Sequence, residues 1–228
     1  MSDLIKPVPE GTSLGDWTIK VNGEERTDVR YVKISNPKFG KLAWGVRPEI
    51  SNSLGWMWEE VGGGGIGIVP YYIIRGELMI GVIEELRPAA GGKALNIPRG
   101  FLTPGESPLQ AATSELGEEI GLIDRTLEPL GGEPVNSNTT FFETTPTADG
   151  PRGFRFYALR IMVSEVEGDE EGLRLRSDLF HPVNKMGEKI MKCVFLSCKR
   201  AMALADGFTC IGVGRLIAHM HEDLDITF

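Results

Sequence analysis

Three glutamates stand close together in one short stretch of the chain, and their spacing suggests metal chemistry. Glu115, Glu118 and Glu119 lie three and four residues apart, so in an α-helix they would share one face. Carboxylates gathered in this way repel one another unless they face open water or a cation neutralises them. Oxygen-only ligands favour hard divalent ions, so Mg2+ or Mn2+ is the expected metal. A solvated acidic face on a surface helix is the alternative explanation.

The flanking residues predict the helix that carries these carboxylates, over residues 107–120. Ser107 is a suitable N-cap, Pro108 suits the first helical turn, and Gly121 is a suitable stop. Between them an apolar stripe recurs at helical spacing, formed by Leu109, Ala112, Leu116 and Ile120. The stripe and the glutamates occupy different faces of the helix.

Residues 100–122 resemble the signature of the Nudix hydrolases, which is Gly, five residues, Glu, seven residues and then Arg-Glu-aliphatic-any-Glu-Glu-any-Gly-aliphatic. Ser114 stands where the family has Arg, and a serine carries no charge with which to neutralise the acidic face. The face should therefore depend more on metal, and the first carboxylate should be held less firmly. The matching residues are Gly100, Glu106, Glu115, Leu116, Glu118, Glu119, Gly121 and Leu122.

The residues before the signature are similar to the ADP-ribose pyrophosphatase-like branch of that family. There a strand ends in aromatic-Arg-Pro, and a short loop leads to Leu-Pro-Ala-Gly; here the counterparts are residues 86–88 and 97–100. The resemblance implies a substrate site at Arg87, Arg99 and Gly100, with the backbone carbonyl of Arg99 as a metal ligand. For Arg87 the alternative is an ordinary surface arginine at the end of a strand.

The same branch commonly places a further glutamate, as metal ligand or general base, ahead of the last strand. Glu188 matches by register, because it precedes the strand predicted over residues 191–196. Glu170 and Glu171 are the alternatives, within a charged stretch, residues 164–189, that is expected to be a long loop. A solvated surface charge is the plainer explanation for each of the three.

Composition limits the classes of partner. The 228 residues carry a net charge of −8, which argues against a nucleic-acid partner, because phosphate backbones need clustered Lys and Arg. A small anionic substrate is still compatible with this charge, since a metal supplies local positive charge. Cys193, Cys198 and Cys210 form no CxxC pair and suit a reducing compartment. No apolar run reaches signal-peptide or membrane-spanning length, so we expect a cytoplasmic protein without a membrane partner.

The chain is expected to contain two parts. Residues 1–61 predict a small, mainly β segment, with strands over 16–21 and 29–34. Residues 62–228 are then expected to form the Nudix domain, an α/β fold. It is an α/β/α sandwich, in which helices flank a mixed sheet. Its strands are expected over 66–74, 78–86, 154–163 and 191–196, and its later helices over 198–206 and 210–221. By analogy with the similar branch, the N-terminal segment packs across a homodimer.

The resemblance implies a Nudix-type pyrophosphohydrolase acting on phosphoric anhydrides. Its substrate would be a nucleoside diphosphate linked to another group, with ADP-ribose or a nucleotide sugar the first choice. NAD(H), dinucleoside polyphosphates and nucleoside triphosphates stay open. The implied catalytic carboxylates are Glu115, Glu118, Glu119 and Glu188. Ser114 favours the alternative, a weak or inactive sensor or scaffold that binds such nucleotides without cleaving them.

Overall fold

The structure is a computed structural model that describes residues 19–21, 24–26, 31–36, 40–47, 51–60, 63–87, 92–135, 153–169, 172–183 and 189–224. Contacts within the chain divide it into two compact units. The first comprises residues 1–64 and 134–153, and the second comprises residues 65–133 and 154–228.

The first unit is built from antiparallel strands. β1 (Ile19–Val21) pairs with β2 (Glu24–Arg26). A separate sheet has the order β3-β4-β5, from β3 (Tyr31–Asn36), β4 (Gly40–Arg47) and β5 (Ser51–Glu60). The prediction of a mainly β N-terminal segment is confirmed for the residues described.

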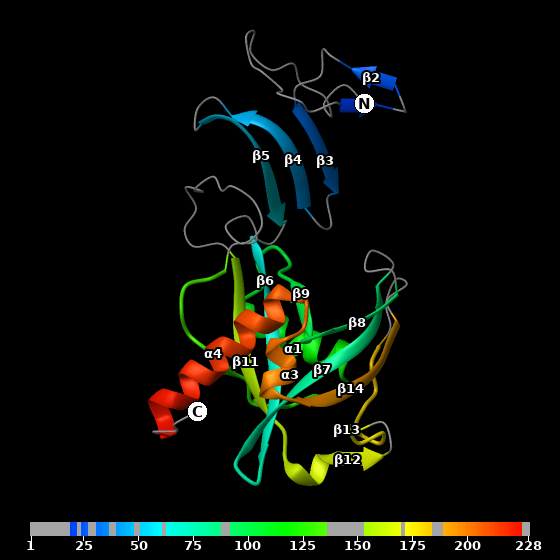
Figure 1. Ribbon diagram of the computed structural model, residues 1–228, viewed down its shortest axis with the longest axis vertical. Helices are drawn as coiled ribbons and strands as arrows, with labels where there is room; N and C mark the ends of the chain where they lie inside the picture. The colour runs from blue at the N-terminus through cyan, green and yellow to red at the C-terminus, as the bar shows by residue number, and fades with distance from the viewer. Residues whose placement is uncertain are drawn as a thin grey trace. The chain divides into compact units, whose positions relative to one another are not determined.

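The strands that follow form a larger sheet in the order β10-β11-β6-β7-β14-β13-β12, with β8 added to β7 and β9 added to β6 (Figure 1). The strands are β6 (Gly64–Ile74), β7 (Glu77–Arg87), β8 (Gly92–Asn96), β9 (Arg99–Phe101), β10 (Glu128–Pro129), β11 (Gly153–Arg160), β12 (Val166–Asp169), β13 (Gly172–Leu175) and β14 (Lys189–Ser197).

This sheet is mixed, as predicted. Gly153 donates its backbone N–H to the Gly63 carbonyl, and Ile161 donates to the Tyr71 carbonyl, so β11 advances alongside β6 in the same direction. The neighbours of β7 and the β12–β13 pair are antiparallel. The parallel strands are second and third in this order, and both of their faces are buried, as is usual for parallel strands.

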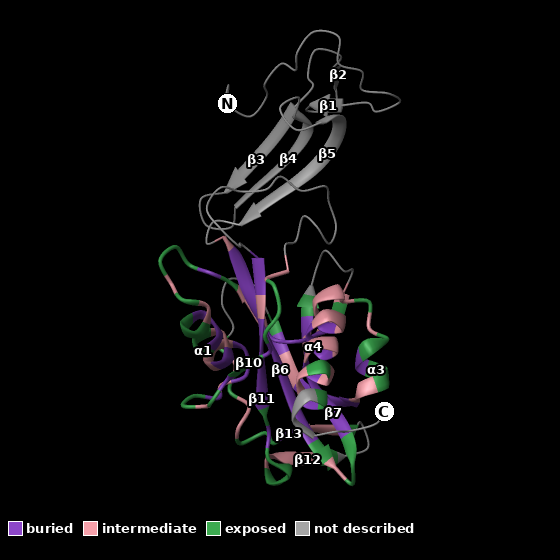
Figure 2. Cartoon of the chain, turned by 90° about the vertical axis from the view of Figure 1, so that its left-hand side faces the viewer, coloured by how far each residue is buried: buried purple, intermediate pink, exposed green. Residues whose placement is uncertain are grey.

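Helices cover both faces of this sheet. α1 (Pro108–Glu119) lies on one side, and α3 (Cys198–Met202) and α4 (Gly207–Leu224) lie on the other, as Figure 2 shows. A short 3-10 helix, η3 (Val163–Glu165), follows β11. The predicted α/β/α sandwich is therefore confirmed. None of the described helices is long and apolar enough to span a membrane.

Alternate residues of β6 serve the two faces. One face contributes Ile66, Ile68 and Tyr72 to the core beneath α1. In this core they are joined by Leu116 of α1 and by Ile120, the C-cap of that helix. On the other face Gly67 allows the side chains of Ile97 and Phe156 to lie close to the β6 backbone, because a Cβ at position 67 would be only 3.0 Å from both. Gly212 of α4 is restricted by the same two side chains. The α4 layer therefore sits unusually close to the sheet.

Two expectations were wrong. The helix predicted over 198–206 ends at Met202, and the next helix, predicted from residue 210, already begins at Gly207. The reason is Asp206, whose carboxylate accepts the Thr209 N–H at 2.7 Å and so caps the new helix. Residues 164–189 are also not one loop, since η3 and the β12–β13 hairpin lie within them. Apolar side chains in that hairpin pack on the core: Val166, Leu173 and Leu175.

The two ends of α1 follow the sequence signals. Ser107 accepts the Gln110 N–H at 3.2 Å, and the Gln110 side chain accepts the Ser107 N–H at 3.0 Å, which completes a capping box. Gly121 follows the helix with φ of +90°, a left-handed conformation that favours glycine. A Cβ at Gly121 would lie 2.6 Å from the backbone nitrogen of His181.

We expect Gly121→Ala to lower the free energy of unfolding by about 2–4 kcal/mol, because the left-handed backbone and the clash with the His181 backbone both oppose a side chain. Urea denaturation measures the change. Gly117→Ala is the matched control: it lies inside α1, and the nearest atom to its new Cβ is 3.6 Å away. This control should stabilise the protein by about 0.5–1 kcal/mol, and equal losses in both variants would contradict the prediction.

Candidate active site

The first glutamate of the trio lies directly over Gly100. A Cβ on Gly100 would come within 2.0 Å of Glu115 Oε1, so the carboxylate occupies the space that any side chain at position 100 would take. Glu115 itself is half-buried. The glycine of the signature thus has a physical reason: it lets the α1 carboxylate reach the backbone of β9.

The third glutamate reaches the same strand one residue earlier. Glu119 Oε2 accepts the backbone N–H of Arg99 at 2.8 Å, and the Glu119 side chain is only 7% exposed. A carboxylate buried to this degree is costly unless hydrogen bonds or charges compensate it. Glu115 and Glu119 are therefore brought together at Arg99 and Gly100, two adjacent residues of β9.

The end of α1 is tied to the segment that follows β13. Val183 donates its N–H to the Glu118 carbonyl at 2.6 Å, and His181 donates to the Ile120 carbonyl at 2.9 Å. The Glu118 side chain is half-buried. Farther along the chain, Lys189 at the start of β14 pairs with Leu86 near the end of β7.

The oxygen atoms gathered at β9 are of the type that binds a hard divalent cation. Carboxylate oxygens from Glu115 and Glu119 meet the backbone of Arg99 and Gly100, and such oxygens suit Mg2+ or Mn2+. Within the described ranges no three carboxylate, imidazole or thiol side chains form a ready-made metal cluster. Mg2+ does not require one, since it is usually held by one or two carboxylates together with waters and substrate phosphates.

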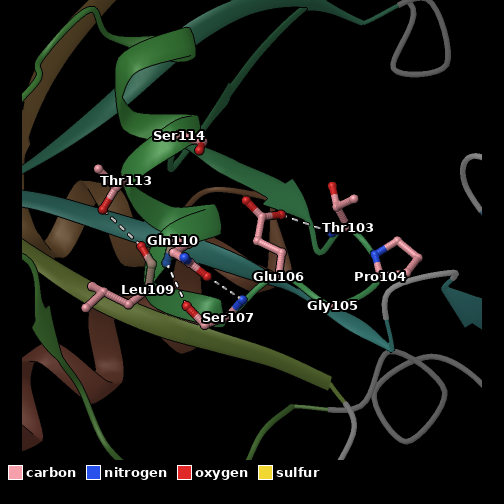
Figure 3. Close-up of a pocket in the computed structure, with 9 residues that line it drawn as sticks. All are labelled: Thr103, Pro104, Gly105, Glu106, Ser107, Leu109, Gln110, Thr113 and Ser114. Atoms are coloured by element: carbon pink, nitrogen blue, oxygen red, sulfur yellow. Dashed lines mark hydrogen bonds between the residues drawn. The ribbon is translucent and has the colours of Figure 1, made fainter.

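Glu106 has a local structural role. Its carboxylate accepts the Thr103 N–H at 3.1 Å, and its own N–H donates to the Thr103 carbonyl, so it closes the turn before α1. Glu106 and the exposed Ser114 both line an open groove of about 850 Å3 along the first turns of α1 (Figure 3). Ser114, the residue that departs from the family signature, therefore faces an open groove that the Glu106 carboxylate also lines.

The guanidinium of Arg99 points away from α1 and is engaged on the α4 side. Its Nη1 donates to Asp206 Oδ2 at 2.6 Å, and its central carbon lies 5.3 Å from the ring centre of Phe208. Both charged side chains are mostly buried, at 15% and 18% exposure. Sequence reasoning missed Asp206 and Phe208; the only local signal was an aspartate three residues before Thr209, a common capping pattern.

A second polar pair was also missed. Glu85 of β7 is 2% exposed and accepts a hydrogen bond from Asn96 Nδ2 at 2.8 Å. Because side chains alternate along β8 and β9, Asn96 lies on the same sheet face as Gly100, while Ile97 and Arg99 face α4. The pair therefore fixes β8 to β7 on the face that carries the glutamates.

Several predicted site residues fall outside the described part of the chain. Glu188, Glu170 and Glu171 are not among the described residues. Arg87 is the last residue of β7, and its backbone pairs with Gly92 of β8, but its side chain is not described. Roles for these four residues stay predictions.

Comparison with known proteins decides the family. A model of the NUDIX domain matches residues 73–190, which is more than half of the chain. The chain belongs to the Nudix family. The matched range includes the capped helix α1, the strand β9 beneath it and the glycine at position 100.

Similarity to individual proteins is more limited. The ADP-sugar pyrophosphatase of Mus musculus is 36% identical over 72 residues, which are 30% of this chain and 33% of the mouse protein. The match thus spans about a third of that relative's length. A crystal structure of an ADP compounds hydrolase has 13% identity and a TM-score of 0.48, covering 86% of this chain and 94% of that chain. The NUDIX domain of Shewanella oneidensis NrtR, complexed with ADP ribose, has 13% identity and a TM-score of 0.40, covering 70% and 86%.

We expect Gly100→Ala to weaken binding of Mn2+ by about tenfold or more, because the new Cβ must displace the Glu115 carboxylate. Stability should change little, since the displaced atoms are the end of a flexible side chain. Titration of Mn2+ followed by electron paramagnetic resonance measures the affinity, and thermal unfolding measures stability. Gly214→Ala in α4 is the control, because nothing lies within 4 Å of its Cβ. Unchanged Mn2+ affinity in Gly100→Ala would contradict this role for the glycine.

Proposed function

We propose that this Nudix protein hydrolyses the diphosphate bond of a nucleoside diphosphate linked to another group, in the presence of Mg2+ or Mn2+. The observation that carries the proposal is the meeting of Glu115 and Glu119 at two adjacent residues of β9. An ADP-sugar such as ADP-ribose is the first substrate to test, supported by the similarity of 72 residues to the mouse ADP-sugar pyrophosphatase.

Each residue has a proposed role. Glu115 and Glu119, with Glu118 beside them, hold the metal together with the Arg99 carbonyl. When bound, the metal neutralises the diphosphate and lowers the pKa of a coordinated water. Arg87 contacts a phosphate of the substrate.

The proton balance requires a base. Glu188 is proposed to take the proton from the attacking water, because it directly precedes β14, whose first residue, Lys189, pairs with Leu86 near the end of β7. The water oxygen then bonds to one phosphorus, the bridging P–O bond breaks, and the other phosphate leaves. With ADP-ribose the products are AMP and ribose 5-phosphate.

A second candidate is a sensor that binds such nucleotides without turnover. Ser114 favours it, because the residue is exposed and supplies no positive charge beside Glu115. Arg99 does not supply that charge at close range either, since its guanidinium pairs with Asp206 on the α4 side. The negative net charge is compatible with either candidate, and the homodimer expected from the resemblance stays a prediction.

Glu119→Gln should lower kcat by about 10^3-fold or more, because several kcal/mol of charge stabilisation depend on the metal that this carboxylate holds. The measurement is chromatographic detection of AMP from ADP-ribose, ADP-glucose, NADH, a dinucleoside tetraphosphate and ATP with Mg2+. Glu133→Gln changes an exposed carboxylate outside the site and serves as the control. Tight binding of one of these nucleotides without turnover of any, in the unmodified protein, would favour the sensor.

Ser114→Arg should raise kcat by about 1.4- to five-fold, the effect of one exposed charge contact of about 0.2–1 kcal/mol. The groove has room for the longer side chain, and Glu106 on its wall offers a partner. Ser114→Gln is the control, since it adds length without charge. Equal rates for the unmodified protein and for both variants would show that the missing charge does not limit turnover.

A further inference from the structure

The strand that receives the glutamates is anchored from its other face by a polar network on α4. Asp206 lies at the centre of this network. Its Oδ2 accepts from Arg99, and its Oδ1 accepts both the N–H and the hydroxyl of Thr209, each at 2.7 Å. One carboxylate thus joins the guanidinium of β9 to the first turn of α4.

Thr209 extends the network back to the chain just before β9. Its hydroxyl oxygen accepts the backbone N–H of Ile97 at 3.0 Å, and the residue is fully buried. The start of α4 is therefore hydrogen-bonded to this segment at two positions: to the backbone of Ile97 and to the side chain of Arg99. The helix is itself well anchored in the core, since Val213 and Leu216 are fully buried.

The same residue, Arg99, meets the glutamate helix through its backbone. Its N–H donates to Glu119, and the neighbouring Gly100 receives Glu115. Because β9 is only three residues long, a shift of the Arg99 side chain moves the backbone to which both carboxylates are fitted.

We propose that Asp206 is a positioning residue for the metal-binding edge at Arg99 and Gly100, acting through the guanidinium of Arg99. The inference rests on the proposed function, because it assigns Asp206 to the support of that same site. A purely structural role, as the N-cap of α4, is the alternative. The two roles separate because asparagine is as good an N-cap as aspartate but cannot form the ion pair with Arg99.

Asp206→Asn should therefore weaken Mn2+ binding by about tenfold, the usual effect of removing a group that supports a metal ligand, while the melting temperature changes by only a few degrees. Arg99→Ala should show a similar loss. The double variant should be no worse than the more affected single variant, because both changes remove one interaction. Mn2+ affinity is measured by electron paramagnetic resonance without substrate, and kcat and KM for ADP-ribose are measured separately.

Glu167→Gln is the matched control, because it neutralises the carboxylate of another arginine pair, 3.1 Å from Arg174, on the edge strand β12. Unchanged Mn2+ affinity in Asp206→Asn, with affinity lost in Glu119→Gln, would overturn this inference and leave the proposed function intact. Unchanged affinity in Glu119→Gln would overturn the metal site itself. Additive losses in the double variant would also overturn the inference, since Asp206 and Arg99 would then act independently.

Discussion

The hydrogen bond from the Arg99 N–H to the buried carboxylate of Glu119 is the contact on which the arrangement of the site depends. It joins a helix to a strand through a side chain that would be costly to bury alone. Once Glu119 is fixed to the backbone, the rotation of α1 is fixed as well. Glu115 lies one turn earlier on the same helix face, so it is delivered to the next residue, Gly100.

The layers of the sandwich explain why this contact can hold. Three residues of the predicted apolar stripe, Ala112, Leu116 and Ile120, are almost completely buried under the sheet. The prediction was wrong for Leu109, which lies in the first turn of α1 and is 50% exposed. On the opposite face α4 comes close to β6 because glycines stand at positions 67 and 212. β9 lies between these two layers, and it is held by carboxylates from both: Glu119 on one face and Asp206 on the other. The short strand is thus a joint between two helices that do not contact the same sheet face.

Local signals made one half of this arrangement predictable. The N-cap at Ser107, the helical stripe and the glycine stop at Gly121 all act within α1, so sequence spacing was enough to place the glutamates on one helix. The resemblance then connected Gly100 to them. The fold class followed from the same resemblance, and the predicted strands and amphipathic helices agree with it, because helices can bury both faces of a sheet.

The other half depends on partners far apart in sequence. Asp206 lies 107 residues from Arg99, and no local pattern announces that pair. The sequence around Gly207 is ambiguous, since glycine both ends helices and begins them, and the capping by Asp206 decides which. Glu85 was assigned to an ordinary strand position, because alternation does not distinguish a buried polar side chain from a solvated one, and its partner Asn96 lay outside the predicted strands.

The capping box at Ser107 has a consequence for how an anion can be held. The start of a helix often serves as a trap for phosphate, through its unpaired backbone amides and its partial positive charge. In α1 two of these amides cannot contribute: proline at position 108 has no amide hydrogen, and the amide of Gln110 already donates to the Ser107 hydroxyl. The start of α1 is therefore a weaker anion site than an uncapped helix start, and a phosphorylated ligand gains more from a bound cation or from arginine.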